Sequence, residues 1–352
     1  MNTLPPPSGH PVPNFPASLV GQQRLMLFPA LCMLPVAAGV VFVAFINTPA
    51  AILALLGLLA TMSAFVWLDR VEPEPRIHVV NALLWGMGPS VLVSVLVNTS
   101  VSNFFGEDIA AVVSAPIIEE LAKVSGIVLF ARRNLVNSAL DGVIYAGYIS
   151  LGFAAVENVI YYSNAGSVGY LLSTFVMRGL LAPFAHPFFT MWAGLFIGKA
   201  YREHMRARKQ ASAQSLSGVH PGLEEAVQWS VIRPAALKGL ALGVAGHALW
   251  NGSAVIDPLY ILPVTAFNVV LFVVMVRKFV GLRRRETETI RANANFYALS
   301  MNINPVELSV YGDPKLVRKY RKSLKLDQRR AFDDRYAHMV SLLQDASPPP
   351  GR

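Results

Sequence analysis

Seven ionisable side chains stand inside stretches of this 352-residue sequence that are otherwise apolar. They are Glu119, Glu120, Lys123, Glu157, Arg178, His186 and His247. In contact with lipid, the formal charges alone would cost on the order of 15 kcal/mol, more than the stability of many domains. We therefore expect these side chains to converge on one polar site inside the protein. Carboxylates and imidazoles in such a site can exchange protons with water and a substrate, which is general acid–base chemistry.

The stretch SAPIIEELAKVSGIVLF, residues 114–130, contains two of the carboxylates and the lysine. On a helix, Lys123 lies four residues after Glu119 and three after Glu120, so it can neutralise one of them. Two adjacent acids with one cation suit a pair in which one stays charged and the other exchanges a proton. The alternative is a buried ion pair that only holds helices together, and we expect such a structural role for Lys123 and Arg178.

Three later segments each add polar side chains to an apolar background. FAAVENVIY contains Glu157, APFAHPFF contains His186, and GHALWNGSA places His247 and Asn251 one helical turn apart. Each residue taken alone is compatible with a packing role or a single hydrogen bond. Their recurrence in neighbouring segments favours a shared site.

The depth of each side chain follows from the helical rise of about 1.5 Å per residue. This rise puts Glu119, Glu157 and His247 in the outer half of the bilayer. His186 comes out deeper if its helix begins at Gly169. Either that helix begins nearer Arg178, or His186 lies outside the site.

The residue types indicate amide hydrolysis. The sequence has no HExxH zinc helix and no serine-nucleophile motif, and its single cysteine, Cys32, lies outside the polar set. A glutamate can take a proton from attacking water, a histidine can protonate the leaving amine, and Asn251 or a histidine can donate to the oxyanion. Alternatively, Glu157, His186 and His247 could bind zinc while another glutamate acts as the base.

The elements that must position these residues are membrane-spanning helices. The chain is 54% hydrophobic and only 14% charged, against about 25% charged in soluble proteins. A window of roughly 20 apolar residues predicts an all-α, polytopic membrane protein with about eight spans. The spans are 26–46, 50–68, 78–97, 109–131, 137–162, 169–198, 235–254 and 259–276. The sixth is too long for one straight crossing and contains Pro183 and Pro187, so we expect it to be kinked, tilted or broken.

Lysine and arginine alternate between the connections, which predicts that both termini are cytoplasmic. We divide the chain into a Pro-rich, disordered N-terminus (1–25), a transmembrane helical domain (26–276, catalytic core 109–254) and a basic cytoplasmic tail (277–352). In the tail, Asp313 is a predicted helix N-cap. The tail helix is expected to pack on the protein's own cytoplasmic face or to contact anionic lipid headgroups. No nucleic-acid partner is expected.

Four motifs resemble the PrsW family of intramembrane proteases, which is similar to the CAAX prenyl protease and ABI group. They are EELAK at 119–123, FAAVENVIY at 153–161, the histidine of AHPFF, and HALWN at 247–251. The resemblance covers about 110–255. It implies a multi-pass protease of the plasma membrane that cuts membrane-protein substrates, in some members an anti-sigma factor.

Carried over by position, the resemblance implies that Glu119 and Glu120 are the water-activating pair. Glu157 takes the place of a histidine in the CAAX group, and His186, His247 and Asn251 complete the site. The family resemblance is compatible with no cofactor or with one divalent metal ion, zinc.

Two other functional classes fit the same residues. Intramembrane glutamate, lysine and histidine also build proton relays, so a proton-coupled transporter or channel is one alternative. Transporters usually show paired broken segments from an internal repeat, whereas this sequence has one Pro-interrupted span. The other alternative is a non-catalytic binding member of the same fold.

Overall fold

The computed structural model describes residues 18–70, 74–214, 223–255, 261–298, 303 and 305–345. Within these ranges the regular elements are all helices, as the sequence predicts. Residues 1–17 of the predicted disordered N-terminus lie outside the described ranges. The rest of that segment differs from the prediction, because the first helix begins at Ser18.

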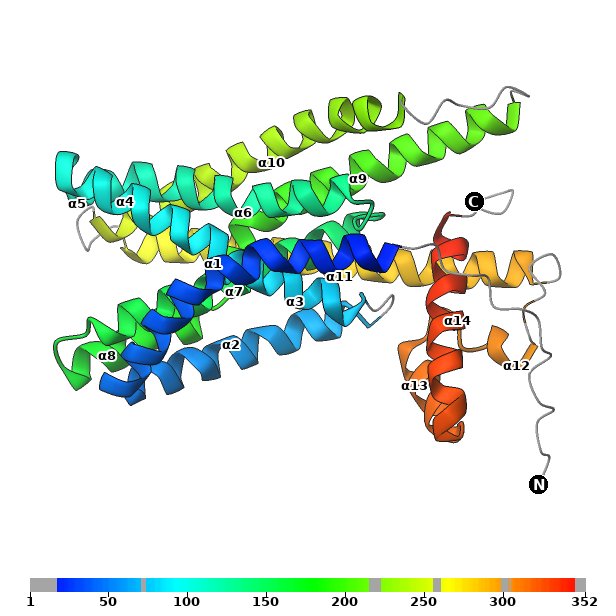
Figure 1. Cartoon of the computed structure of the whole chain (residues 1–352), viewed down its shortest axis with the longest axis horizontal. Coiled ribbons are helices and arrows are strands. Elements are labelled where there is room, and N and C mark those ends of the chain that lie inside the picture. Colours follow the sequence, from blue (N-terminus) through cyan, green and yellow to red (C-terminus); the bar gives the residue numbers. More distant parts are fainter. Residues whose placement is uncertain are drawn as a thin grey trace.

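The helices divide into a membrane bundle and a C-terminal unit (Figure 1). The first half of the bundle comprises α1 (Ser18–Ile46), α2 (Thr48–Leu68), α3 (Arg76–Trp85), η1 (Gly86–Ser90), α4 (Val91–Phe105), α5 (Glu107–Ile109), η2 (Ala110–Ser114) and α6 (Ala115–Arg132). The second half comprises α7 (Ala139–Ser163), α8 (Val168–Phe175), η3 (Val176–Leu181), α9 (Ala185–Gln214), α10 (Leu223–Val255) and α11 (Ile261–Tyr297). The C-terminal unit contains α12 (Pro305–Leu308), α13 (Pro314–Ser323) and α14 (Leu326–Asp345).

Four helical stretches among the described residues are long and apolar enough to cross a bilayer. They are Thr48–Leu68, Arg76–Phe105, Ala139–Ser163 and Val168–Met205. The chain is therefore a multi-pass membrane protein. The other predicted spans also coincide with helices, namely α1, α6, α10 and α11. Their crossing of the membrane, the total of eight and the cytoplasmic position of both termini remain predictions.

Helix α7 forms the centre of the bundle, and nearly all of its apolar window is buried. It packs mainly against α9 and also against α2 and α3. The contact with α9 depends on small residues, because a Cβ atom on Gly142 would lie 2.0 Å from the carbonyl oxygen of Gly194. Such close backbone approach is typical of glycine at membrane helix interfaces. It fixes the relative position of the two helices that carry Glu157 and His186.

The helix around 169–198 is broken, as its prolines predict. α8 and the π-helical η3 end at Leu181, and α9 begins at Ala185 after a short irregular segment containing Pro183. A proline removes one backbone donor and clashes with the preceding turn, which explains the interruption. The break also changes the position of His186, which lies in the first turn of a new helix rather than within one continuous helix from Gly169.

The predicted tail does not begin at a structural boundary, since α11 continues without interruption from Ile261 to Tyr297. Its C-terminal half packs with α12–α14 around a separate apolar cluster that includes Ile290, Phe332 and Tyr336. α14 crosses the direction of α11 beyond the bundle (Figure 1). The Asp313 side chain accepts hydrogen bonds from two backbone N–H groups at the start of α13, which confirms the predicted N-cap.

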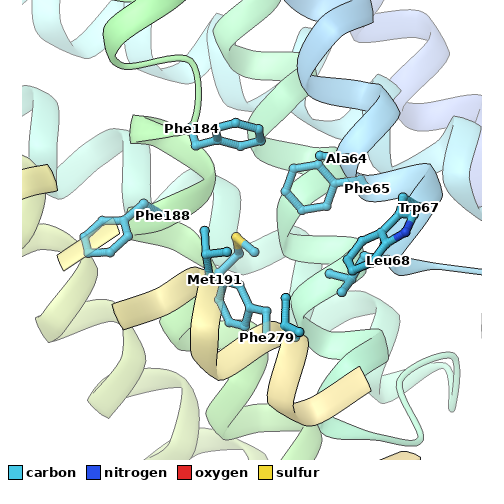
Figure 2. A pocket seen from close by; sticks show the side chains of 10 residues that line it. Ala64, Phe65, Trp67, Leu68, Phe184, Phe188, Met191 and Phe279 are labelled. Carbon is cyan, nitrogen blue, oxygen red and sulfur yellow. The ribbon is translucent and has the colours of Figure 1, made fainter. Parts of the chain in front are cut away.

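An apolar pocket of about 110 Å³ lies between α2, the start of α9 and α11 (Figure 2). Phe65, Phe184, Phe188, Met191 and Phe279 contribute to its walls. No ionisable side chain lines it. This pocket therefore lacks the groups that acid–base chemistry needs.

Candidate active site

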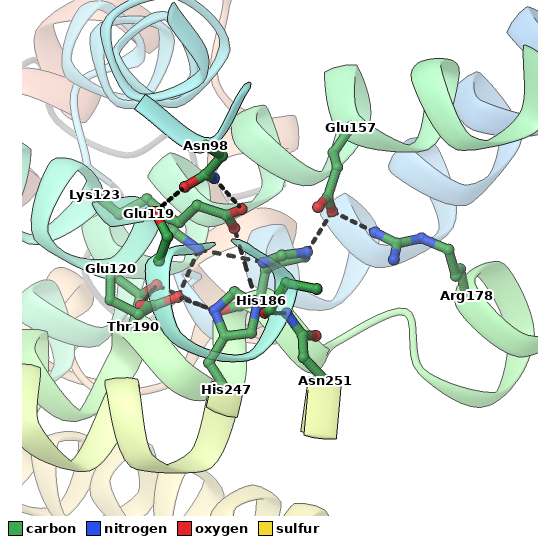
Figure 3. Close-up of polar contacts among 12 residues, drawn as sticks. Asn98, Glu119, Glu120, Lys123, Glu157, Arg178, His186, Thr190, His247 and Asn251 are labelled. Carbon is green, nitrogen blue, oxygen red and sulfur yellow. Dashed lines mark hydrogen bonds and ion pairs between the residues drawn. The ribbon is translucent and has the colours of Figure 1, made fainter. Parts of the chain in front are cut away.

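The predicted polar residues meet at one place in the bundle interior (Figure 3). α6 contributes Glu119, Glu120 and Lys123, α7 contributes Glu157, and α10 contributes His247 and Asn251, while Arg178 and His186 come from η3 and α9. Glu120 and Lys123 are fully buried, and Glu119, His186 and His247 are each less than a tenth exposed. The ionisable side chains therefore lie together inside the protein, as the cost of burying charge predicts.

Glu120 has donors on both carboxylate oxygens. Its Oε1 accepts a hydrogen bond from Lys123 Nζ at 2.6 Å and lies 3.1 Å from His247 Nδ1. Its Oε2 accepts from the hydroxyl of Thr190 at 2.7 Å. Charged and neutral donors together stabilise the ionised carboxylate. Glu120 is thus the member of the acidic pair that is held charged.

Glu119 is in a different state although it is the adjacent residue. Its Oε1 accepts one long hydrogen bond, 3.4 Å, from Asn98 Nδ2. Its Oε2 is buried and has no hydrogen-bond partner among the described residues. That oxygen lies 3.9 Å from His247 Nε2. Since a buried acceptor without a partner is costly, this oxygen marks a position for a water molecule, a metal ion or a substrate atom.

His186 is held from two sides. Its Nε2 lies 2.6 Å from a carboxylate oxygen of Glu157, and its Nδ1 lies 3.2 Å from Lys123 Nζ. Glu157 is also paired with Arg178, whose Nε donates to Asn158 Oδ1 at 2.9 Å. Glu157 therefore lies behind His186, between the ring and the guanidinium.

His247 is fixed by stacking and by the residue one turn later on its helix. The ring of His247 stacks on Phe189 at a centroid distance of 4.9 Å and an interplanar angle of 14°. Asn251 Nδ2 donates to the carbonyl oxygen of Ala111 at 2.8 Å. That carbonyl is available because the backbone N–H of Ala115 bonds to Ala110 instead, and residue 116 is a proline without an N–H. The π-helical turn η2 thereby ties α10 to the start of α6.

Three of these side chains fit a divalent metal ion. One donor atom from each of Glu119, His186 and His247 lies within 4.8 Å of the others. Glu119 Oε2 and His247 Nε2, which are 3.9 Å apart, are close enough for both to reach one zinc ion with bonds of about 2.0–2.2 Å. Both histidines also place their other ring nitrogen on a carboxylate, the usual arrangement around a metal-binding imidazole. The sequence predicts Glu157, His186 and His247 as the ligands. In the structure Glu119 takes the place of Glu157 in this set.

A polar cavity of about 30 Å³ adjoins this cluster, which is room for about one water molecule. Its walls include Glu157, Arg178, His186, His247 and Asn251. The cavity brings solvent-sized space next to both histidines. The arrangement therefore has the parts for water-dependent hydrolysis: a free carboxylate oxygen, two oriented imidazoles and an amide donor.

Sequence reasoning missed three polar residues of the cluster. Thr190 lies four residues after His186, so helical spacing could have revealed it. Asn98 lies just beyond the predicted span 78–97, whereas α4 continues to Phe105. Asn158 directly follows Glu157 in the sequence. These three side chains carry no charge, so the cost of burying charge in lipid does not point to them.

The model of the PrsW family intramembrane metalloproteases matches residues 74–281 of the chain, which include every residue of this cluster. The chain is 29% identical to Protease PrsW of Clostridioides difficile (strain 630) over 154 residues, covering 41% of this chain and 64% of that protein. It is 29% identical to Protease PrsW of Geobacillus kaustophilus (strain HTA426) over 147 residues, covering 40% of this chain and 62% of that protein. The match thus spans less than two thirds of either relative. No solved structure matches the chain.

Proposed function

The chain belongs to the PrsW family of intramembrane metalloproteases, and on that premise we propose that it is an intramembrane endopeptidase of the cell membrane that hydrolyses a peptide bond of membrane-protein substrates. The observation that carries the proposal is the contrast between the adjacent acids. Glu120 is bonded through both oxygens, whereas Glu119 has a buried oxygen without a partner that faces His247.

In the form that needs only side chains, Glu119 is the general base. Its Oε2 takes a proton from a water molecule that attacks the substrate carbonyl between Glu119 and His247. Glu119 then passes this proton to His247 Nε2, 3.9 Å from its Oε2, and the histidine gives it to the leaving amine. Asn251 uses one N–H of its amide on Ala111, which leaves the second N–H for the developing oxyanion. Glu120 and Glu157 act as positioning residues, because each holds one imidazole by a ring nitrogen.

In the metal-dependent form, Glu119, His186 and His247 would hold the ion. A divalent metal supplies Lewis acidity, which polarises the scissile carbonyl and makes water a stronger nucleophile. Glu120 and Glu157 keep the same task in this form, since they orient the two imidazoles. Glu119 is indispensable in both forms.

The substrate class follows from the position of the cluster. Because its carboxylates and imidazoles are buried within apolar helices, a peptide bond must enter the bilayer to reach them. We therefore assign membrane-embedded proteins as substrates, with regulatory proteins such as anti-sigma factors as the proposed class. Exposed cations of α13 and the residues around it are proposed to contact anionic headgroups. They are Lys315, Arg318, Lys319, Lys322 and Lys325.

Mapping of new protein N-termini in membranes of a bacterial host tests the proposal. Cells producing the full chain should contain N-termini inside membrane-spanning segments of host proteins that are absent with Glu119→Gln. Glu203→Gln, at an exposed position of α9, is the matched control and should leave these N-termini present. If the wild-type chain and Glu119→Gln give the same N-termini while both insert at equal levels, the protein is a non-catalytic member of the family.

A further inference from the structure

Lys123 is a cation at the centre of the candidate site, and its side chain is completely buried. Its Nζ lies 2.6 Å from Glu120 Oε1 and 3.2 Å from His186 Nδ1. The ring of Phe153 covers it at 4.4 Å from Nζ to the ring centroid. The ammonium group therefore lies against one of the side chains that fit a metal ion.

The contacts of His186 determine which of its nitrogens carries the proton. An ammonium group can only donate hydrogen bonds, so His186 Nδ1 must accept from Lys123. Glu157, paired with Arg178, accepts at the other nitrogen, so Nε2 carries the proton. The lone pair on Nδ1 is consequently the one that His186 offers to a metal ion, and Lys123 is bonded to that same lone pair.

The net charge of the cluster also favours competition between Lys123 and a metal ion. When Glu119 is ionised, as a metal ligand must be, and both histidines are neutral, the carboxylates of Glu119, Glu120 and Glu157 and the cations Lys123 and Arg178 leave one net negative charge. A divalent ion added beside Lys123 would make the cluster positive. The same ion added without the lysine charge would make it neutral, which a low-dielectric interior favours.

We infer that Lys123 is a built-in competitor of the metal ion: its ammonium is bonded to the lone pair of His186 Nδ1 and must leave that nitrogen when Glu119, His186 and His247 bind a metal. Lys123 thereby stabilises the metal-free cluster and lowers its affinity for divalent metal. This inference rests on the metal-dependent form of the proposed function, and it does not require that the loaded protein cleave any particular substrate.

Zinc binding by the detergent-purified full chain tests the competition, measured by titration against a chromophoric chelator and by metal content per chain. Lys123→Met should bind zinc at least tenfold more tightly than the wild type. Lys123→Arg, which keeps the positive charge, should stay near the wild-type affinity. His247→Ala combined with Lys123→Met should remove the gain, which assigns the binding to this cluster. Lys238→Met, at an exposed lysine of α10, controls for the loss of one charge elsewhere.

Several outcomes would overturn the inference. They are equal or weaker zinc binding by Lys123→Met, a gain that survives His247→Ala, and the absence of zinc binding by both proteins. If Lys123→Met loses helicity or aggregates, Lys123→Gln replaces it, because the amide keeps a donor towards Glu120 without the charge. The result is independent of the N-terminus mapping, so proteolysis and metal competition can fail separately.

Discussion

Neutralising Glu120 should destabilise the protein much more than neutralising Glu119, although the two residues are adjacent. Glu120→Gln removes the charge that pairs with Lys123 at 2.6 Å, where both side chains are fully buried. Breaking a buried pair by removing one partner costs about 3–5 kcal/mol, because an uncompensated charge stays behind. The nearby carboxylate of Glu119 offsets part of this cost, so we expect a loss near the lower end, about 3 kcal/mol.

Glu119→Gln should cost less than about 1 kcal/mol. The carboxylate accepts only the 3.4 Å hydrogen bond from Asn98, and an amide oxygen can accept the same bond. The glutamine amide nitrogen would also face His247 Nε2, which lies 3.9 Å from Glu119 Oε2.

The free energies of unfolding can be compared by titrating the purified proteins from mild detergent into SDS and following their helicity. Thr190→Val is a useful third variant, since it removes a neutral donor from Glu120 without changing the charge and should fall between the two. Equal losses for Glu119→Gln and Glu120→Gln would refute the assignment of one free and one charged carboxylate. A larger loss for Glu119→Gln would refute it as well.

Three further predictions concern the elements around the site. Gly142→Val should destabilise the bundle by about 1–3 kcal/mol in the same SDS titration, because its Cβ would lie 2.0 Å from the Gly194 carbonyl oxygen. Gly57→Val is the control and should have little effect, because no atom lies within 4 Å of a Cβ at that position. Burial raises the pKa of Asp69 from 3.8 to about 7, with the Asp141 carboxylate adding to the shift. The folded state therefore holds this proton more tightly than the unfolded chain, so the contribution of Asp69 to stability should be complete below about pH 4 and be lost as pH rises through about 7; Asp69→Asn should flatten the pH dependence of stability in that interval. Asp313→Ala should lower the stability of the C-terminal unit by about 1 kcal/mol, which hydrogen exchange of α13 would detect.

Much of the architecture could be predicted because it depends on local composition. Long apolar runs must become helices in a bilayer, since lipid offers no partner for backbone groups. The break near Pro183 and the N-cap at Asp313 depend on backbone rules that act over a few residues. Helix ends are harder to predict where composition changes gradually. The helix containing Asn98 continues past its apolar window, and α11 continues past the predicted start of the tail.

The sequence by itself determined that the buried charges must meet, because scattered ionisable groups in lipid would cost more free energy than folding provides. It also determined, by helical spacing, that Lys123 could pair with either adjacent glutamate. Only the tertiary structure decided that Lys123 and Thr190 bond Glu120 and leave an oxygen of Glu119 free. The physical reason is that hydrogen bonds between helices depend on how closely and in which register the backbones pack, as at Gly142 and Gly194, and no spacing within one helix contains that information.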